Sequence, residues 1–241
     1  MKNNDTPETV LVLRTCYADL TSHGGFQWPN EVGAIVTAPD WRNDNECGHG
    51  LHGWLFGQGD AGVSDSIRRQ DAKWLVVEVA LQDVVALGGK VKFPSCTIRH
   101  IGDKQSATEY LLEHEPRAAS VAVIGSTLTG GNRSTLTGGY GSTLTGGYGS
   151  TLTGGDGSTL TGGDRSTLTG GYGSTLTGGD GSTLTGGNRS TLTGGEKSEL
   201  RIRKWCSKSE RYRTYNAYVG EDGIEPGVAY RLDDNNKFVK A

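Results

Sequence analysis

One eight-residue phrase, repeated nine times without an insertion between Gly125 and Glu196, limits what the middle of this 241-residue chain can fold into. Each copy reads x-Ser-Thr-Leu-Thr-Gly-Gly-x, and a decayed tenth copy, KSELRIRK, begins at Lys197. A helix needs apolar residues three and four apart, whereas each copy has one leucine, two β-branched threonines and a glycine pair. The phrase therefore predicts a short strand followed by a turn.

Successive side chains of a strand point to opposite faces, so Thr127 and Thr129 point one way while Ser126 and Leu128 point the other. A single short strand cannot bury one leucine, but stacked coils line the leucines into a ladder. Two octads per coil is the simplest closure. Nine octads then give about four and a half coils, and a rod roughly 20 Å long at ~4.8 Å per stacked strand.

The glycine pair of each copy is expected to form the corner of the coil, because glycine reaches positive φ without steric cost. The opposing interpretation is a disordered Gly/Ser/Thr linker, which buries too little apolar surface to offset chain entropy. Strict spacing of the leucines argues against a linker. In the tenth copy Glu199 and Arg201 replace the threonines while Ser198 and Leu200 persist, which predicts a charged cap against edge-to-edge association.

The segment GGYGSTLTGGYGSTLTGG, from Gly138 to Gly155, resembles the central repeats of bacterial ice nucleation proteins, and the resemblance extends over the nine copies. It implies a β-solenoid whose outward threonine rows order water, with a tyrosine ladder that supports self-association. Ice or ordered water, and further copies of the chain, are the partners that it implies. The ice-facing residues would be Thr127, Thr129, Thr135, Thr137, Thr143, Thr145, Thr151, Thr153, Thr159, Thr161, Thr167, Thr169, Thr175, Thr177, Thr183, Thr185, Thr191 and Thr193.

The residues at the joints between copies depart from that family. With sixteen residues per coil, one corner column reads Tyr140, Asp156, Tyr172, Asn188, and the other reads Asn132, Tyr148, Asp164, Asp180, Glu196. No continuous tyrosine ladder results, and the short array lets one molecule template only a small cluster of water. Arginines follow three acidic or amide joint residues, so local charge or amide pairs are expected at these corners.

Globular segments flank the repeat. Residues 1–116 contain strand-like stretches and a helix-like stretch, KQSATEYLLEHE, with Tyr110, Leu111 and Leu112 expected to be buried. Residues 201–241 alternate aromatic and polar side chains and predict two or three antiparallel strands. The fold class is therefore mainly β: a small α+β domain (1–116), a β-solenoid (117–200) and a C-terminal β-hairpin cap (201–241).

The segment ECGHGLHGW concentrates the reactive side chains of the chain. Cys47, His49 and His52 are a weak candidate for a metal site that Cys16 or His23 would complete. They are alternatively a candidate nucleophile, Cys47, activated by His52, with Glu46 or Asp60 to orient the imidazole. The third interpretation is structural, with the glycines forming a turn that Trp54 and Leu55 anchor. Together with RTCYADLTSHGGFQWP, the segment looks like an uncharacterised domain that precedes similar repeats in bacterial and phage-like proteins.

Charge and composition exclude several classes of function. A net charge of −3, from 24 basic and 27 acidic residues spread along the flanks, gives neither a nucleic-acid footprint nor a polybasic membrane patch. The N-terminal MKNNDTPETV lacks an apolar signal region, so a cytoplasmic location is expected, with four reduced cysteines. No cofactor is expected.

Three functions remain open on these grounds. The first is a non-enzymatic solenoid whose threonine ladders bind ice or ordered water. The second is a scaffold or self-assembling module whose rod separates or oligomerises its ends. The third is a metal-binding or enzymatic N-terminal domain centred on Cys47, His49 and His52. Bulky replacements on one threonine face would abolish the first function and leave the other two intact.

Overall fold

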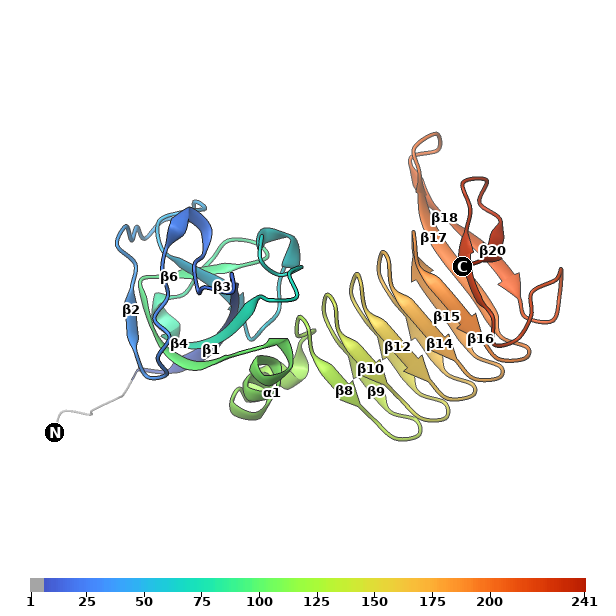
Figure 1. Cartoon of the computed structure of the whole chain (residues 1–241), viewed down its shortest axis with the longest axis horizontal. Helices are drawn as coiled ribbons and strands as arrows, with labels where there is room; N and C mark the ends of the chain where they lie inside the picture. Colours follow the sequence, from blue (N-terminus) through green and yellow to red (C-terminus); the bar gives the residue numbers. More distant parts are fainter. Residues whose placement is uncertain (1–6) are drawn as a thin grey trace. The chain divides into compact units, whose positions relative to one another are not determined.

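The computed structural model describes residues 7–241, and the chain divides into two compact units, Met1–Ile124 and Gly125–Ala241 (Figure 1). The first six residues of the predicted N-terminal domain lie outside the described residues. Each unit encloses a hydrophobic core of its own. The sequence-based prediction of a mainly β chain with a solenoid of two octads per coil is confirmed.

An antiparallel sheet of seven strands forms most of the N-terminal unit, in the order β2-β7-β4-β1-β3-β6-β5. The strand β1 lies inside the sheet, and its consecutive residues Val10 to Leu13 are all buried, as expected for a strand covered on both faces. The strands are β1 (Thr9–Cys16), β2 (Ile35–Thr37), β3 (Leu51–Leu55), β4 (Lys73–Ala80), β5 (Val85–Ala86), β6 (Val91–Phe93) and β7 (Ser95–Gly102). Single 3-10 turns connect them: η1 (His23–Gly25), η2 (Ala61–Val63) and η3 (Leu81–Asp83).

One α-helix, α1 (Lys104–His114), packs against this sheet. Its N-cap residue is Asp103, whose carboxylate accepts a hydrogen bond from the Ser106 amide. The Ser106 hydroxyl in turn accepts one from the Asp103 amide, which completes a capping box. The expected burial is only partly right: Leu111 is fully buried, but Tyr110 and Leu112 are half-exposed because they lie beside the buried stripe of the helix. Within residues 7–241, no helix is both long and apolar enough to cross a bilayer.

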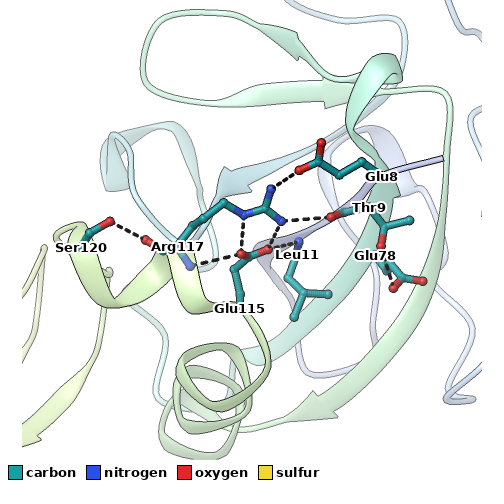
Figure 2. A network of polar contacts seen from close by, with 7 residues as sticks. All are labelled: Glu8, Thr9, Leu11, Glu78, Glu115, Arg117 and Ser120. Atoms are coloured by element: carbon teal, nitrogen blue, oxygen red, sulfur yellow. Dashed lines mark hydrogen bonds and ion pairs between the residues drawn. The ribbon is translucent and has the colours of Figure 1, made fainter. Parts of the chain in front are cut away.

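The turn η4 (Pro116–Ser120) follows α1, and the buried carboxylate of Glu115 at its start is hydrogen-bonded to β1 (Figure 2). Glu115 is 2 % exposed and accepts from the Leu11 amide at 3.0 Å and from the Arg117 guanidinium at 2.6 and 2.9 Å. Arg117 also reaches Glu8 at 2.8 Å and the Thr9 carbonyl at 3.0 Å. Burial alone would raise the pKa of Glu115, but these hydrogen bonds hold it below its ordinary value.

The repeats form a solenoid in which successive octads alternate between two parallel sheets (Figure 1). Identical residues sixteen positions apart are paired, so that Thr143 pairs with Thr127 and Thr159, and Leu144 with Leu128 and Leu160. One sheet contains β8 (Thr127–Thr129), β10 (Thr143–Thr145), β12 (Thr159–Gly162), β14 (Thr175–Gly178) and β16 (Thr191–Gly194). The other contains β9 (Thr135–Thr137), β11 (Thr151–Thr153), β13 (Thr167–Thr169), β15 (Thr183–Gly187) and β17 (Glu199–Cys206).

The corners of the solenoid differ from the prediction. Positive φ falls on the residue just before each serine, such as Gly157 (φ 66°) or Arg165 (φ 56°), and not on the glycine pair. The pair is required instead by close packing: a Cβ on Gly154 would lie 2.6 Å from Ser158 Cβ, and a Cβ on Gly155 would lie 2.7 Å from the Tyr140 amide nitrogen. The glycine pair therefore leaves space for close packing, while the residue just before each serine forms the left-handed turn.

Antiparallel strands close the C-terminal end of both sheets, as the alternating pattern predicted. The strand β18 (Arg211–Tyr218) pairs with β17, while β19 (Ala229–Leu232) pairs with β16 and with β20 (Phe238–Lys240). The side chains of Tyr230, in β19, and of Val219 and Ile224, between β18 and β19, are buried in the same core as the leucine ladder. The charged tenth copy is thus an internal rung, and the strands after it form the cap.

Candidate functional site

Two threonine surfaces are the most regular feature of the second unit. We call the outer surface of β8, β10, β12, β14 and β16 the even face, and that of β9, β11, β13 and β15 the odd face. The even face has five Thr-Leu-Thr rungs and the odd face four, since its next rung carries the ion-paired Glu199 and Arg201. All of the threonines predicted to face outward do so. Thirteen are exposed, and the five that are half-buried are Thr143, Thr183, Thr185, Thr191 and Thr193.

Beneath both faces, leucine and serine ladders hold the rungs in register. The leucines from Leu144 to Leu200 are at most 1 % exposed. The serines next to them are also buried, and from Ser158 onward their hydroxyls donate to the carbonyl of a glycine on the preceding coil, as in Ser166 to Gly147 at 3.3 Å and Ser182 to Gly163 at 3.2 Å. Because the buried serines from Ser158 onward have fixed partners on the preceding coil, the outward threonines above them are presented on a rigid backbone.

The corner columns are linked along the rod by hydrogen bonds that sequence reasoning did not find. The side chains of Asn132 and Asp156 accept from the amides of Tyr148 and Tyr172, sixteen residues later, at 3.0 and 2.8 Å. Asp164 and Asp180 do the same for the coils that follow them. The signal was present in the sequence, since these joints hold Asn or Asp, whose short side chains bond to nearby backbone amides.

One expected local pair is present, since the Arg189 amide donates to the Asn188 side chain at 3.0 Å, but the guanidinium groups of Arg165 and Arg189 contact the preceding coil instead. Arg165 donates to the Tyr148 hydroxyl at 3.0 Å, and its guanidinium lies 5.8 Å from the centroid of that ring. The guanidinium of Arg189 likewise lies 5.7 Å from the centroid of the Tyr172 ring. Both arginines have positive φ, and each guanidinium contacts a tyrosine of the preceding coil.

The reactive side chains of the N-terminal unit line one cavity of about 780 Å³. Cys47, His49, His52 and His23 all lie on its wall, whereas Cys16 is buried in the hydrophobic core. Among residues 7–241, however, no three His, Cys, Asp or Glu side chains converge closely enough to hold a metal ion. The weak metal candidate therefore gains no support from the geometry.

The arrangement proposed for a nucleophilic cysteine is not assembled either. Cys47 is exposed, and no hydrogen bond within the described part of the chain joins it to His52. Asp60 instead caps the turn η2 by accepting from the Gly62 amide at 2.7 Å. Burial lowers the pKa of His52 to about 4, with smaller contributions from Lys90, Arg14 and Lys92, so the ring is neutral near pH 7.

The structural interpretation of ECGHGLHGW agrees with the local backbone. Gly48, His49 and Gly50 all have positive φ, which forms the turn that leads into β3. Trp54 is 2 % exposed, and its indole donates to the Asp60 carbonyl at 3.0 Å. A Cβ on Gly53 would lie 2.4 Å from the Val12 side chain, so glycine lets β3 approach β1.

Comparisons with known proteins give two kinds of match. Residues 10–113 match a family described as a domain of unknown function, DUF7666. The ice nucleation protein InaU of Pantoea ananas is 38% identical over 141 residues, 53% of this chain and 13% of the relative. The ice nucleation protein of Xanthomonas campestris pv. translucens is 46% identical over 111 residues, 45% of this chain and 7% of the relative.

The repeats are ice-nucleation-protein-like. The ice nucleation protein of Pseudomonas syringae pv. syringae is a further relative, 35% identical over 51% of this chain and 10% of its own length. The chain thus spans about a tenth of the length of the curated relatives that it matches. No solved structure matches the chain.

The ice-nucleation-like solenoid has its own corner arrangement. Tyr148 and Tyr172 are 39 % and 46 % exposed, and one lies in each corner column. Each tyrosine contacts an arginine one coil later rather than a second tyrosine. The corners of this solenoid are therefore columns of mixed charge, amide and aromatic character, as the joint residues predicted.

Proposed function

We propose that the chain is a non-enzymatic, ice-nucleation-like protein whose threonine rungs bind ice or order water. The supporting observation is the repetition of one Thr-Leu-Thr rung in strict register on both faces of the solenoid. Stacked strands lie about 4.8 Å apart, and alternate residues along a strand are separated by roughly 6.7 Å. The outward hydroxyls and methyls therefore form a grid with two fixed spacings.

The chemistry of threonine suits such a grid. Its β-branched side chain is stiff at χ1, so each hydroxyl and methyl occupies few positions relative to the backbone. A hydroxyl can both donate to water and accept from it. A rigid array of these groups can therefore hold a layer of water in repeated positions, whereas long polar side chains would lose that order.

We assign this role to the even face. It has one rung more than the odd face, and its rows of five rungs span about 19 Å at ~4.8 Å per strand. The odd face ends against the Glu199 and Arg201 pair, whose charged side chains interrupt the threonine grid. A patch of this size binds an existing ice surface more readily than it starts a crystal by itself.

The test compares two variants of the full chain that change one face each. The even-face variant carries Thr159→Tyr, Thr161→Tyr, Thr175→Tyr and Thr177→Tyr; the odd-face variant carries Thr151→Tyr, Thr153→Tyr, Thr167→Tyr and Thr169→Tyr. Tyrosine suits strands, so both solenoids should fold, as circular dichroism and amide exchange would show. The expected result is that the wild type and the odd-face variant partition into slowly grown ice, while the even-face variant stays in the liquid.

Two outcomes would contradict the proposal. Equal partition by both variants would show that the even face is not the ice-binding surface. Failure of the folded wild type to enter ice or to change the facets of growing crystals would remove ice binding, and would leave a scaffold or self-assembling rod as the function.

A further inference from the structure

The cavity of the N-terminal unit contains a buried positive charge that has no counter-ion among the described residues, 7–241. It lies where β1 ends and β3 begins, and its volume of about 780 Å³ is within the range of small-molecule sites. Arg14, on its wall, is 8 % exposed. None of the ion pairs found among residues 7–241 includes Arg14.

The neighbours of Arg14 leave its guanidinium only partly satisfied. Its plane lies over the Trp28 ring, 3.7 Å from the centroid, and Nη1 donates to the His52 carbonyl at 3.3 Å. Its Nε is buried and has no hydrogen-bond partner. Burial lowers the pKa of Arg14, but arginine stays protonated in proteins, so the charge persists. An unpaired buried charge costs stability, which a bound anion would offset.

The other polar groups on the wall favour an anion as the occupant. Lys90 lines the cavity, and His52 Nε2 is buried without a hydrogen-bond partner. The acidic groups on the wall are Asp40 and Asp65, both more than half-exposed and within 3.5 and 3.9 Å of His49 and His23, respectively. The carboxylates thus have partners of their own at the mouth, while the deeper charge is positive.

Hydroxyl groups add further donors to the same wall. Thr15 Oγ1 lies 2.6 Å from Ser64 Oγ and 2.9 Å from Ser66 Oγ, and all three residues line the cavity. Hydroxyls rotate to suit a ligand, and together with an arginine fork they match the several oxygens of a phosphate group. The aromatic rings of Phe26 and Trp28 supply an apolar wall for the remainder of such a ligand.

We propose that this cavity binds a small molecule that carries a phosphate group, and that Arg14 is its principal contact to the phosphate. The guanidinium offers Nε and the Nη groups as a fork, which is the arrangement that binds phosphate oxygens in a bidentate manner. Lys90 adds a second positive charge. The site is separate from the threonine faces, because all its residues belong to the N-terminal unit.

The experiment titrates the full chain with inorganic phosphate at constant ionic strength and follows tryptophan fluorescence, since Trp28 contacts Arg14. Wild-type protein should give a saturable change. Arg14→Met should raise the half-saturation concentration at least about tenfold through loss of the charge-assisted fork. Arg14→Lys should bind more weakly than wild type, because lysine keeps the charge without the fork. Arg68→Met is the matched control, since Arg68 is exposed and does not line the cavity.

The outcomes that overturn the proposal are equally specific. Absence of a saturable change in the wild type, an unchanged half-saturation in Arg14→Met, or an equal increase in Arg68→Met would each do so. If Arg14→Met fails to fold by circular dichroism, Lys90→Gln provides the second test: it should raise the half-saturation, and an unchanged value would overturn the proposal.

Discussion

The octad has two kinds of glycine position: the pair, which is glycine in all nine full copies, and the residue before the serine, which is glycine in six copies and arginine in three. Gly154 has a neighbour, Ser158, whose Cβ would be 2.6 Å from an added Cβ, so any side chain there meets the buried serine. Gly157 has positive φ and open space around it, and arginine takes the equivalent place at Arg133 and Arg165. Within the nine full copies, the residue before the serine therefore varies and the glycine pair does not.

We expect Gly154→Ala to lower the free energy of unfolding of the solenoid by about 3 kcal/mol, the upper part of the range for overpacking in a tight core. Gly157→Asn is the matched control. Asparagine adopts the left-handed region readily, so its cost should be below about 1 kcal/mol. Chemical denaturation followed by circular dichroism measures both. A cost for Gly154→Ala no greater than that of Gly157→Asn would contradict the packing argument.

At the scale of elements, the C-terminal strands protect the last coil. Parallel strands stacked in register leave an open edge, and an open edge of this regularity pairs readily with another chain. The strands β18 and β19 cover β17 and β16, and Tyr230 in β19, with Val219 and Ile224 from the connection between the two strands, extends the leucine core. The outer strand β18 carries Arg211 and Arg213, and charges of this kind discourage further pairing.

Removal of residues 207–241 is expected to produce association that increases with protein concentration, because the edges of β16 and β17 become open. Sedimentation velocity measures it. The control is the double variant Trp205→Ser and Tyr212→Ser, which removes an exposed aromatic pair, 5.3 Å between centroids, and leaves the strand pairing intact. A truncated chain that stays monomeric at all concentrations would show that these strands do not protect the edge.

At the scale of the whole molecule, sixteen residues are the unit in which the solenoid can change length. Paired residues along both sheets are separated by that number, and the serine and asparagine or aspartate contacts between coils repeat with it. Each coil contacts its neighbours only, so stability should be roughly the sum of coil and interface contributions.

Deletion of residues 159–174 joins Ser158 to Thr175 and restores an intact octad, so we expect a folded solenoid that is one coil shorter. Deletion of residues 159–175 removes one residue more and joins Ser158 to Leu176. Adjacent residues of a strand face opposite ways, so serine and leucine cannot both point inward. Amide exchange should show protected coils in the first variant and lost protection around the junction in the second. Equal amide protection in the two variants would contradict the sixteen-residue period of the coil.

Much of the solenoid was predictable because its determinants are local. Side-chain alternation along a strand is fixed by backbone geometry, so the inward leucines and outward threonines follow from the octad alone. The glycine pair was placed correctly at the corner but given the wrong reason, since the clash that requires glycine involves residues on the same and the preceding coil. Burial along α1 was overestimated because flanking positions of an amphipathic helix stay half-exposed.

The sequence by itself determined the period, the strand-and-turn character of the repeat and the chemistry of its faces, because these depend on neighbours within eight residues. Only the tertiary structure decided which residues share the cavity, since Arg14 meets a carbonyl 38 residues away and Thr15 a hydroxyl 51 residues away. It also decided that Arg165 reaches Tyr148, and that none of the ion pairs found among residues 7–241 includes Arg14. Such contacts depend on how distant strands are ordered in the sheet, and no local spacing in the chain encodes that order.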